Sequence, residues 1–303
     1  MQVHLGLDQV LPEWSGSVVC VGTFDGVHLG HRHVIGTAVA LARERELPCV
    51  LFTFDRHPAA VLDPKRTPPC LRSLAANLER FRAMGVGVSV VQPFTADFRQ
   101  TSAERFLREF LIGRLRAQAV VVGQDFGFGK NREGDAAWLA ARLETRAVEP
   151  VLLGGERISS TAIRAAVQEG RMEDAAGMLG EPFAAEGLVV GGERLGRQLG
   201  YPTLNLARSV RQVVPADGVY AGRAHTERGV FTAAVSVGSK PTLEGRDRVV
   251  EAHLLDYPGD ALYGSAASVE LSRRLRGQVK FESLEALQMQ MAADVRAVRD
   301  VYR

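Results

Sequence analysis

The sequence predicts two domains of different class, a parallel α/β domain followed by an all-β barrel with a C-terminal helix. Over about the first 180 residues, apolar runs alternate with helical patterns, which is typical of a parallel sheet covered by helices on both faces. Near Glu181 the pattern changes to short apolar or alternating segments separated by glycine and proline, which favours a small barrel. Apolar residues three and four apart predict a helix over Ser283–Val301. We therefore expect domains over residues 1–181 and 182–303.

The first domain is expected to contain buried strands connected by helices. The expected strands are Val18–Val21, Val50–Phe54, Val86–Val91, Ala119–Val122 and Val148–Leu153. The expected helices are His33–Arg45, Leu74–Met84, Ala103–Leu115 and Ala136–Thr145. Ligands of such sheets bind outside the carboxyl ends of the strands. Segments that follow a strand are therefore the first candidates for a site.

The second domain is expected to be built from short strands. These are Ala184–Val190, Tyr220–Thr226, Phe231–Val237, Val249–Leu255 and Ser268–Leu275. Ser283, followed by Glu285 and Ala286, is a plausible start for the terminal helix.

Composition narrows the class of protein. The chain has 303 residues, of which 46% are hydrophobic and 24% charged, as in ordinary globular proteins. Its net charge of +2 gives no reason to expect a nucleic acid or a membrane as partner. Cys20, Cys49 and Cys70 form no CxxC pattern, which argues against structural zinc and fits a reducing compartment. The sequence shows no signal peptide and no membrane span, so we expect a cytoplasmic protein; its oligomeric state stays open.

The most informative segment is the glycine-rich turn of residues 22–31, between a strand and a helix. Glycines let a backbone approach an anion, and a helix N-terminus offers unpaired N–H groups. His28 and His31 lie one turn apart, so both can point at the same phosphate. A plain polar helix cap is the alternative. The candidate residues of the turn are Gly22, Phe24, Asp25, Gly26, His28, Gly30 and His31.

Three further segments carry groups suited to phosphate. Thr53–Pro58 ends the second strand, and Val122–Asp135 is a glycine-rich loop with Lys130 and Arg132. Ile158–Arg164 begins a helix that a serine can cap, with an arginine one turn later. Taken singly, a solvated loop and an ordinary cap are strong alternatives. The candidates here are Asp125, Phe126, Ser159, Ser160, Thr161 and Arg164.

A second glycine-rich segment, Gly187–Asn205, lies in the barrel domain. Its loop can surround phosphates with backbone N–H groups. Thr203 and Asn205 alternate along an extended segment, and their oxygens are suitable ligands for Mg²⁺. A glycine-rich hairpin with a polar edge is the alternative. For Glu251, the residues alone leave open a surface glutamate paired with an arginine.

The turn of residues 22–31 resembles the HxGH signature of cytidylyltransferase-like nucleotidyltransferases. Its full string, GTFDGVHLGH, resembles the N-terminal module of the bacterial bifunctional riboflavin kinase/FAD synthetases, and the three further segments resemble that family in the same order. The resemblance implies a Rossmann-like domain that adenylylates FMN. Arg56 departs from a usual proline and Gly127 from a common arginine, which removes one possible phosphate ligand.

The resemblance also implies roles for the candidates of this domain. His28 and His31 would contact the ATP phosphates and stabilise the transition state. Asp125 and Phe126 would line the nucleotide and flavin cleft. The remaining nucleotide-binding residues would be Gly22, Phe24, Asp25, Gly26, Gly30, Ser159, Ser160, Thr161 and Arg164.

The barrel domain resembles riboflavin kinases. Gly187–Asn205 is similar to their GRxLGxPTAN signature, with Leu204 in place of alanine. Similar segments follow at Pro215–Ala221, Val235–Thr242, with Ser236 in place of asparagine, Val250–Tyr257 and Lys280–Leu287. The resemblance implies Glu251 as general base, Thr203 and Asn205 as Mg²⁺ ligands, and a nucleotide loop that includes Gly191, Gly196, Arg197, Gly200 and Pro202.

Both resemblances together imply a bifunctional enzyme. Riboflavin, FMN and ATP would be its substrates, with Mg²⁺ required for both steps. Two alternatives remain at this stage. The protein could be a riboflavin kinase whose first domain is weak or uses another acceptor, or a non-catalytic flavin-binding regulator.

Overall fold

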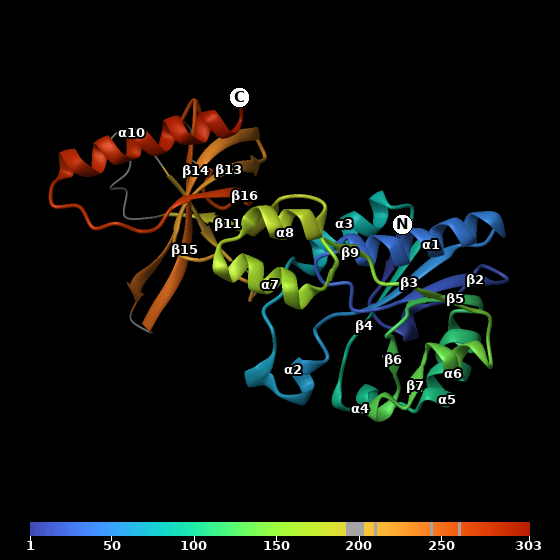
Figure 1. The fold of residues 1–303 in the computed structure, drawn as a ribbon. Helices are drawn as coiled ribbons and strands as arrows, with labels where there is room; N and C mark the ends of the chain where they lie inside the picture. The colour runs from blue at the N-terminus through green and yellow to red at the C-terminus, as the bar shows by residue number, and fades with distance from the viewer. Residues whose placement is uncertain (192–202, 209–210, 243–244, 260–261) are drawn as a thin grey trace. The chain divides into compact units, whose positions relative to one another are not determined.

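The computed structural model describes residues 1–191, 203–208, 211–242, 245–259 and 262–303 (Figure 1). The chain forms two compact units. The first contains Met1–Pro68 and Leu74–Ser159, and the second contains Pro69–Ser73 and Ser160–Arg303. A five-residue piece of the N-terminal half is therefore part of the second unit.

The first unit is built on a six-stranded sheet with the order β1-β4-β3-β2-β5-β8. Every pairing in this sheet is parallel. The strands are β1 (Gln2–His4), β2 (Ser17–Val21), β3 (Cys49–Phe54), β4 (Val88–Gln92), β5 (Ala117–Gly123) and β8 (Thr145–Val148).

Helices cover both faces of the sheet because its inner strands are apolar on both sides. Val18 and Cys20 of β2 pack with α1 (Leu29–Glu44) and α3 (Leu74–Ala83). Val19 and Val21 pack into the opposite core, with η3 (Phe106–Arg114) and α6 (Ala136–Ala140). The predicted parallel sheet with helices on both faces is confirmed.

The connections place a topological switch point beside β2. From β2 the chain moves through α1 to β3 and then through α3 to β4, on one side. It then returns through η3 to β5, on the other side of β2. Connections that leave in opposite directions open a crevice outside the carboxyl ends of the two strands, which is where ligands of doubly wound sheets bind. The carboxyl ends of β2 and β5 therefore mark the site of this unit.

Two sequence predictions for this unit are wrong. The expected strand Val148–Leu153 is instead the end of β8 followed by a hairpin of β9 (Leu152–Leu153) and β10 (Glu156–Arg157). The two leucines are exposed, so an apolar run was misread as a core strand. The expected helix Ala136–Thr145 ends at Ala140, because its last residue begins β8.

Short elements complete the first unit. They are η1 (Leu7–Gln9), α2 (Ala59–Leu62), η2 (Pro64–Arg66), α4 (Ala96–Arg99), α5 (Ala103–Arg105), β6 (Gly127–Phe128), η4 (Lys130–Arg132) and β7 (Gly134–Asp135).

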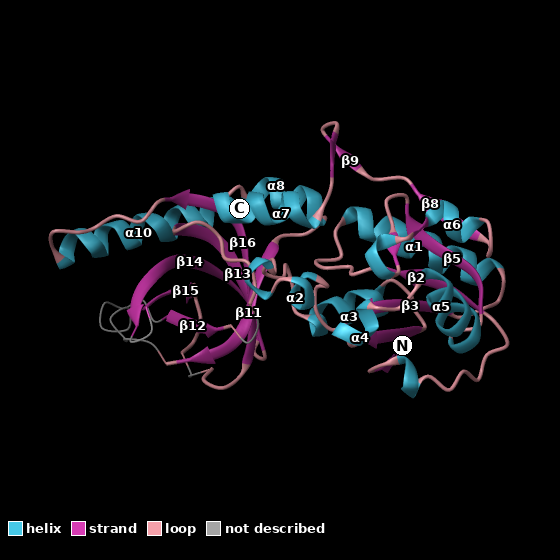
Figure 2. Ribbon diagram, turned by 90° about the horizontal axis from the view of Figure 1, so that it is seen from below, coloured by secondary structure: helices cyan, strands magenta, loops and turns pink. Residues whose placement is uncertain are grey.

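The second unit contains a closed antiparallel barrel with the order β11-β12-β15-β14-β13-β16 (Figure 2). This confirms the predicted barrel. Its strands are β11 (Phe183–Val190), β12 (Thr203–Ala207), β13 (Gly218–Thr226), β14 (Gly229–Thr242), β15 (Gly245–Leu254) and β16 (Ala266–Arg276). Helices α7 (Ser160–Glu169) and α8 (Met172–Leu179) precede the barrel, and α8 contacts β11 and β16.

The terminal helix α10 (Leu284–Val301) packs on the outside of the barrel. Its N-cap is Ser283, whose hydroxyl accepts a hydrogen bond from the Ala286 N–H, as the sequence predicted. Val298 of α10 is buried against Ala221 of β13, and α10 also contacts β14. Among the residues that the structure describes, no helix combines the length and apolarity that a membrane crossing needs.

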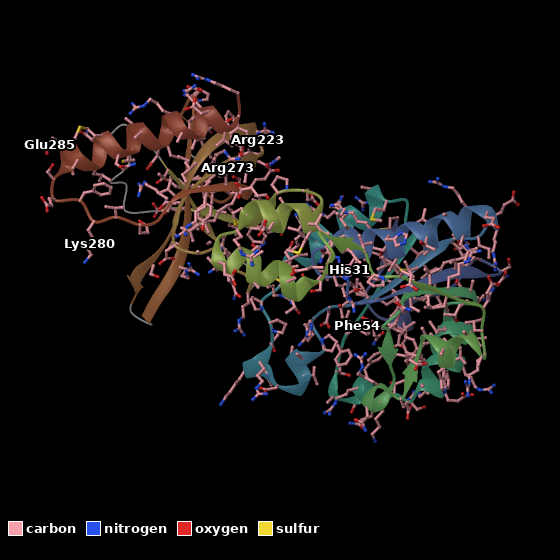
Figure 3. The ribbon with its side chains drawn as sticks, viewed as in Figure 1. His31, Phe54, Arg223, Arg273, Lys280 and Glu285 are labelled. Atoms are coloured by element: carbon pink, nitrogen blue, oxygen red, sulfur yellow. The ribbon has the colours of Figure 1, made fainter. Side chains whose placement is uncertain are left out.

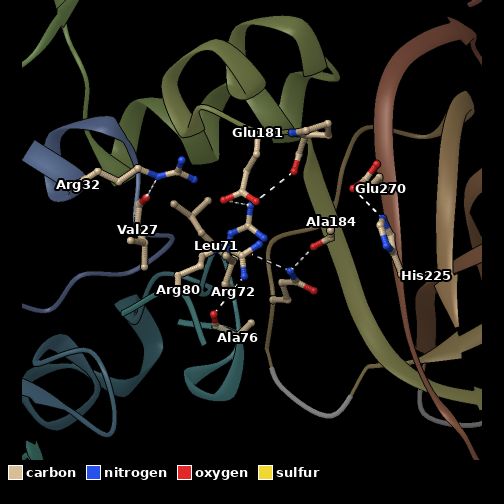
Figure 4. A network of polar contacts seen from close by, with 12 residues as sticks. Val27, Arg32, Leu71, Arg72, Ala76, Arg80, Glu181, Ala184, His225 and Glu270 are labelled. Atoms are coloured by element: carbon tan, nitrogen blue, oxygen red, sulfur yellow. Dashed lines mark hydrogen bonds and ion pairs between the residues drawn. The ribbon is translucent and has the colours of Figure 1, made fainter. Parts of the chain in front are cut away.

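The piece Pro69–Ser73 is built into the second unit by main-chain and side-chain bonds. Cys70 pairs with Gln212 in a parallel bridge, and the Gln212 amide donates to the carbonyl oxygens of Leu71 and Ala184 (Figure 4). Arg72 is 3% exposed and forms an ion pair with Glu181. Because these groups are buried, their bonds hold the segment firmly within the second unit.

Candidate active sites

The turn after β2 is shaped by three residues with positive φ. These are Phe24 (47°), Gly26 (82°) and Val27 (44°). The N–H of Val27 closes the turn on the Phe24 carbonyl oxygen, and Arg32 Nε donates to the Val27 carbonyl oxygen (Figure 4). Such conformations are costly for residues other than glycine and occur often at functional sites. The turn therefore delivers the chain to the start of α1 in one fixed shape.

His28 and His31 are brought together at the N-terminus of α1. His28 is the N-cap, and its Nδ1 accepts a hydrogen bond of 3.2 Å from the His31 N–H. The two imidazole rings stack with centroids 3.6 Å apart (Figure 3 labels His31). His28 is only 5% exposed. The predicted pair is thus a single rigid unit at the switch point, next to the positive end of the α1 dipole.

The neighbouring candidates support this pair. The Phe24 ring is 2% exposed and meets His31 edge-on, with centroids 5.4 Å apart. A Cβ on Gly22 would lie 2.7 Å from the Phe24 ring, and a Cβ on Gly30 would lie 3.1 Å from the His28 ring. Position 22 therefore has no room for a side chain beside the present Phe24 ring, whereas position 30 is only tightly packed against the His28 ring. The structure gives the Phe24 side chain a packing role, while nucleotide contacts of this turn, including Asp25, stay predictions.

The segments after β3 and β5 lie at the same edge of the sheet. Thr53 Oγ1 donates to the Thr23 carbonyl oxygen, which ties the end of β3 to the turn after β2. Asp55 accepts a hydrogen bond from the Phe94 N–H and forms an ion pair with Arg56. The departure from proline at Arg56 thus leaves a guanidinium paired within its own loop.

Asp125 links the loop after β5 to the hairpin that precedes Ser159. Its carboxylate forms an ion pair with Arg157, and its carbonyl oxygen accepts from Arg132 Nη2 at 3.2 Å. Phe126 stacks on Phe128 with ring centroids 5.4 Å apart. Both residues thus closely follow the carboxyl end of β5, and their place in a nucleotide and flavin cleft stays a prediction.

A group of phenylalanines at this edge was missed by the sequence reasoning. Phe54 ends β3 and packs edge-on against Phe94 and Phe98, with centroids 5.1 and 5.6 Å away (Figure 3 labels Phe54). Phe54 and Phe98 are only partly buried, in contrast to Phe52 beneath them. The available signal was the recurrence of phenylalanine in the segments after β3 and β4.

The segment Ile158–Arg164 is divided between the two units. Ser159 ends the first unit, whereas Ser160, Thr161 and Arg164 begin α7 of the second. Arg164 is 9% exposed, and its Nε donates to the Pro69 carbonyl oxygen at 2.7 Å. The structure therefore gives Arg164 a part in fixing Pro69–Ser73, and its phosphate contact stays a prediction.

The barrel brings its own candidates into one row. Asn205 of β12 lies opposite Glu251 of β15, and Glu251 lies opposite Ser236 of β14. The neighbouring row contains Thr203 and His253. The residues between these rows, such as Leu204, are buried in the barrel interior, so the rows lie on its outer face. Thr203, Asn205 and Glu251 thus share one face, with directly opposed residues about 5 Å apart.

Two polar groups that the sequence reasoning missed adjoin this row. Gln278 donates from Nε2 to the Val237 carbonyl oxygen at 3.0 Å and to Ser236 Oγ at 3.3 Å. Arg276 binds Asp294 of α10 through two hydrogen bonds of 2.9 and 2.7 Å. Asp294 is 7% exposed, so this pair fixes α10 to the end of β16. Neither residue stands in a recognisable motif.

Part of the predicted nucleotide loop lies outside the described residues, namely Gly196, Arg197, Gly200 and Pro202. Gly191 is described; it follows β11 and is exposed. Among the described residues, no cluster of three or more His, Cys, Asp or Glu side chains is placed to hold a metal ion.

Two of the three cysteines, Cys20 and Cys49, are buried and chemically unreactive. Burial raises the pKa of Cys49 to about 12 and raises the pKa of Cys20 well above its usual value. Both thiols lie in the core of the first unit, on β3 and β2. They therefore stay neutral and serve as packing groups.

Comparisons with known proteins match both units. The FAD synthetase family model matches residues 10–162, and the riboflavin kinase family model matches residues 179–302. A bifunctional riboflavin kinase/FMN adenylyltransferase of Haemophilus influenzae is 32% identical over 99% of this chain and 98% of its own. The enzyme of the same description from Bacillus subtilis is 35% identical over 93% of this chain and 91% of its own.

A solved structure also matches along the whole length. It is described as a macrolide-efflux protein from Streptococcus pneumoniae and aligns with a TM-score of 0.90 at 32% identity, covering 98% of both chains. That description names efflux, whereas both family models describe enzymes of flavin metabolism. The chain belongs to the family of bifunctional riboflavin kinase/FMN adenylyltransferases.

Proposed function

We propose that this protein makes both flavin cofactors. Its barrel unit transfers the γ-phosphoryl group of ATP to riboflavin, and its α/β unit transfers the adenylyl group of a second ATP to the resulting FMN, releasing pyrophosphate. The observation that supports the proposal is that each family match falls on a fold of the expected kind, with the residues expected for that reaction close together. The stacked histidines stand at the switch point of the sheet, and the Asn205–Glu251 pair stands on the barrel wall.

In the α/β unit, His28 and His31 stabilise the charge that develops on the α-phosphorus and on the leaving pyrophosphate. The attacking FMN phosphate is already an anion, so the reaction needs no strong base, and positioning with charge neutralisation carries the rate. A stacked pair fixed by a cap hydrogen bond suits that task because it needs little reorganisation.

Further groups of this unit bind the substrates. We assign the ATP phosphates to the turn after β2, with Gly22, Asp25, Gly26 and Gly30. The partly buried rings of Phe54 and Phe126, beside Asp125, offer flat apolar faces for an isoalloxazine ring. Ser159, which ends this unit, and Ser160, Thr161 and Arg164, which begin α7 of the second unit, are further phosphate-binding residues that the family resemblance implies.

In the barrel unit, Glu251 acts as general base. The ribityl hydroxyl of riboflavin is a weak acid and must lose its proton as it attacks the γ-phosphorus. Glu251 lies on the outer face of the barrel wall between Asn205 and Ser236, and in this proposal riboflavin binds on that face. The nucleotide loop of Gly191, Gly196, Arg197, Gly200 and Pro202 completes the phosphate site in this proposal.

The oxygen donors of this face fit Mg²⁺. Thr203 and Asn205 offer a hydroxyl and an amide oxygen on one face of β12, and Glu251 adds a carboxylate beside Asn205. Mg²⁺ prefers such oxygen ligands and shares its coordination with ATP phosphates. When bound, it would neutralise charge on the triphosphate.

Two further assignments belong to this proposal. The enzyme works in the cytoplasm, where ATP is plentiful and the thiols of Cys20, Cys49 and Cys70, which form no disulfide, stay reduced. The functional boundary lies near residues 181–182, just after the start of the riboflavin kinase match.

ATP labelled at one phosphate tests the two activities separately. With riboflavin as acceptor, label from the γ-phosphate must appear in FMN. With FMN as acceptor, label from the α-phosphate must appear in FAD, and label from the γ-phosphate must appear in pyrophosphate. Absence of γ-label in FMN would contradict the kinase role, and absence of α-label in FAD would contradict the adenylyltransferase role.

A further inference from the structure

The loop between β6 and β7 is held in one shape. Gly129 has a φ of 75°, and a Cβ there would lie 2.8 Å from the Ala103 nitrogen, so the loop presses on the start of α5. Lys130 N–H donates to the Thr101 carbonyl oxygen, and Glu133 accepts from the Ala103 N–H at 2.7 Å. The position of the loop is therefore set by its backbone contacts with residues 101–103.

Within this loop the chain turns back on itself. Asn131 and Arg132 are consecutive residues with φ of 55° and 58°. Two successive left-handed residues other than glycine are unusual and reverse the direction of the backbone. The reversal carries the Arg132 side chain back over the start of β6.

The Arg132 guanidinium occupies the space that a side chain at position 127 would need. A Cβ on Gly127 would lie 2.7 Å from Arg132 Nη2 and 2.8 Å from both Nε and Cζ. Arg132 Nη2 also donates to the Asp125 carbonyl oxygen. Because position 127 is a glycine, it leaves room for the guanidinium of a residue five positions further along the chain.

Arg132 also differs from the other arginines near this edge of the sheet in its ion pairing. Arg56 is paired with Asp55, and Arg157 is paired with Asp125. Arg132 is exposed and has no ion pair among the residues that the structure describes, and only one of its five N–H donors is assigned, to the Asp125 carbonyl oxygen. A fixed, exposed and unneutralised guanidinium is suited to bind a phosphate through two parallel hydrogen bonds.

We propose that Arg132, whose guanidinium lies over Gly127, is a phosphate-binding residue of the adenylyl-transfer reaction. The inference rests on the proposed function and adds a residue to it. The guanidinium contacts a phosphate of ATP or the phosphate of FMN, both of which must meet at the carboxyl ends of β2 and β5. Gly127 then leaves free the space that the Arg132 guanidinium occupies.

Four variants of the full-length protein test this inference, with FAD formation from supplied FMN as the readout. Arg132→Ala should lower kcat/KM by roughly 10- to 100-fold, the range for loss of a hydrogen-bonded charge. A rise in the KM for ATP or in the KM for FMN identifies which phosphate is bound. Gly127→Ala keeps Arg132 but displaces its guanidinium, so this variant should also have a lower kcat/KM.

The double variant Gly127→Arg/Arg132→Ala returns a guanidinium to the same space from the other end of the loop. Its kcat/KM should be at least about tenfold higher than that of Arg132→Ala. A merely structural role of Arg132 would not produce this recovery. Arg82→Ala is the control, because Arg82 is an exposed arginine on α3 of the same unit. Phosphorylation of riboflavin should be unchanged in all four.

Two results would overturn the inference. The first is Arg132→Ala with wild-type kcat/KM for FAD formation. The second is a loss in Arg132→Ala that the double variant does not reduce at all. A wild-type protein that forms FMN but no FAD would contradict the proposed function itself, and the inference with it.

Discussion

The imidazole rings of His28 and His31 stack at 3.6 Å between centroids with an interplanar angle of 18°. The His31 N–H also donates to His28 Nδ1, so the helix cap and the ring stack fix the same two residues. Phe24 packs edge-on against His31, and Gly30 lies close beneath the His28 ring. A local sequence of ten residues thus builds a rigid group at the carboxyl end of β2.

This arrangement predicts that either histidine is needed for FAD formation and neither for FMN formation. His28→Asn and His31→Asn should each lower kcat for FMN adenylylation by about 10²- to 10³-fold, as removal of one transition-state donor does. Asparagine at 28 can still cap α1, so the fold should persist. His33→Asn, on the exposed face of the same helix, should have wild-type kcat. Equal losses in all three variants would contradict a specific role.

Glu251→Gln should abolish the other activity. Without a carboxylate between Asn205 and Ser236, the riboflavin hydroxyl loses its base, and kcat for FMN formation should fall by about 10²- to 10⁴-fold. Conversion of supplied FMN to FAD should be unchanged. Glu227→Gln, in the exposed turn between β13 and β14, is the matched control. Loss of both activities, or of neither, would show that the role of Glu251 is misassigned.

Two glycines of the same unit should respond in opposite directions to alanine. A Cβ at Gly22 meets the Phe24 ring, so Gly22→Ala should lower the free energy of unfolding by about 1–3 kcal/mol and reduce FAD formation. A Cβ at Gly36, on α1, meets nothing within 4 Å, so Gly36→Ala should raise that free energy by about 0.5–1 kcal/mol. Urea unfolding measures both. Equal effects would contradict the packing argument.

The buried thiols predict a loss of stability in mild alkali. Burial raises the pKa of Cys20 and Cys49, so the unfolded state loses these protons near pH 8.5–9 while the folded state keeps them. Stability is therefore full below about pH 8.5 and falls as the pH rises. Each thiol should contribute a slope of up to about 1.4 kcal/mol per pH unit between pH 9 and 10.

Urea unfolding across this pH range checks the effect. The slope for wild-type protein should exceed that for the Cys20→Ala/Cys49→Ala variant, whereas both should be flat between pH 7 and 8. Cys70, which is partly exposed, should react with a thiol reagent in the native protein before the other two. Parallel slopes for the two proteins would contradict the assignment.

Features that depend on neighbouring residues were predictable from the sequence. The strand, turn and helix around His28 follow from the positions of the glycines and the spacing of the apolar residues. The cap at Ser283 follows from residues within one helical turn. The same local rules failed for Leu152 and Leu153, because a short apolar run does not show whether tertiary contacts will bury it.

Features that depend on distant contacts were not predictable. The row of Asn205, Glu251 and Ser236 is set by barrel register, which no single segment contains. The placement of Arg132 over Gly127 depends on two successive residues with positive φ, and neither of them is a glycine. Local spacing therefore predicted that His28 lies beside His31, but not that Asn205 lies opposite Glu251.

The most direct measurement is a time course of flavins, separated by chromatography, after the purified protein is mixed with riboflavin, ATP and Mg²⁺. The account predicts that riboflavin declines, FMN rises and then falls, and FAD accumulates as the final product. FMN that accumulates without any FAD, or riboflavin that remains unchanged, would contradict it.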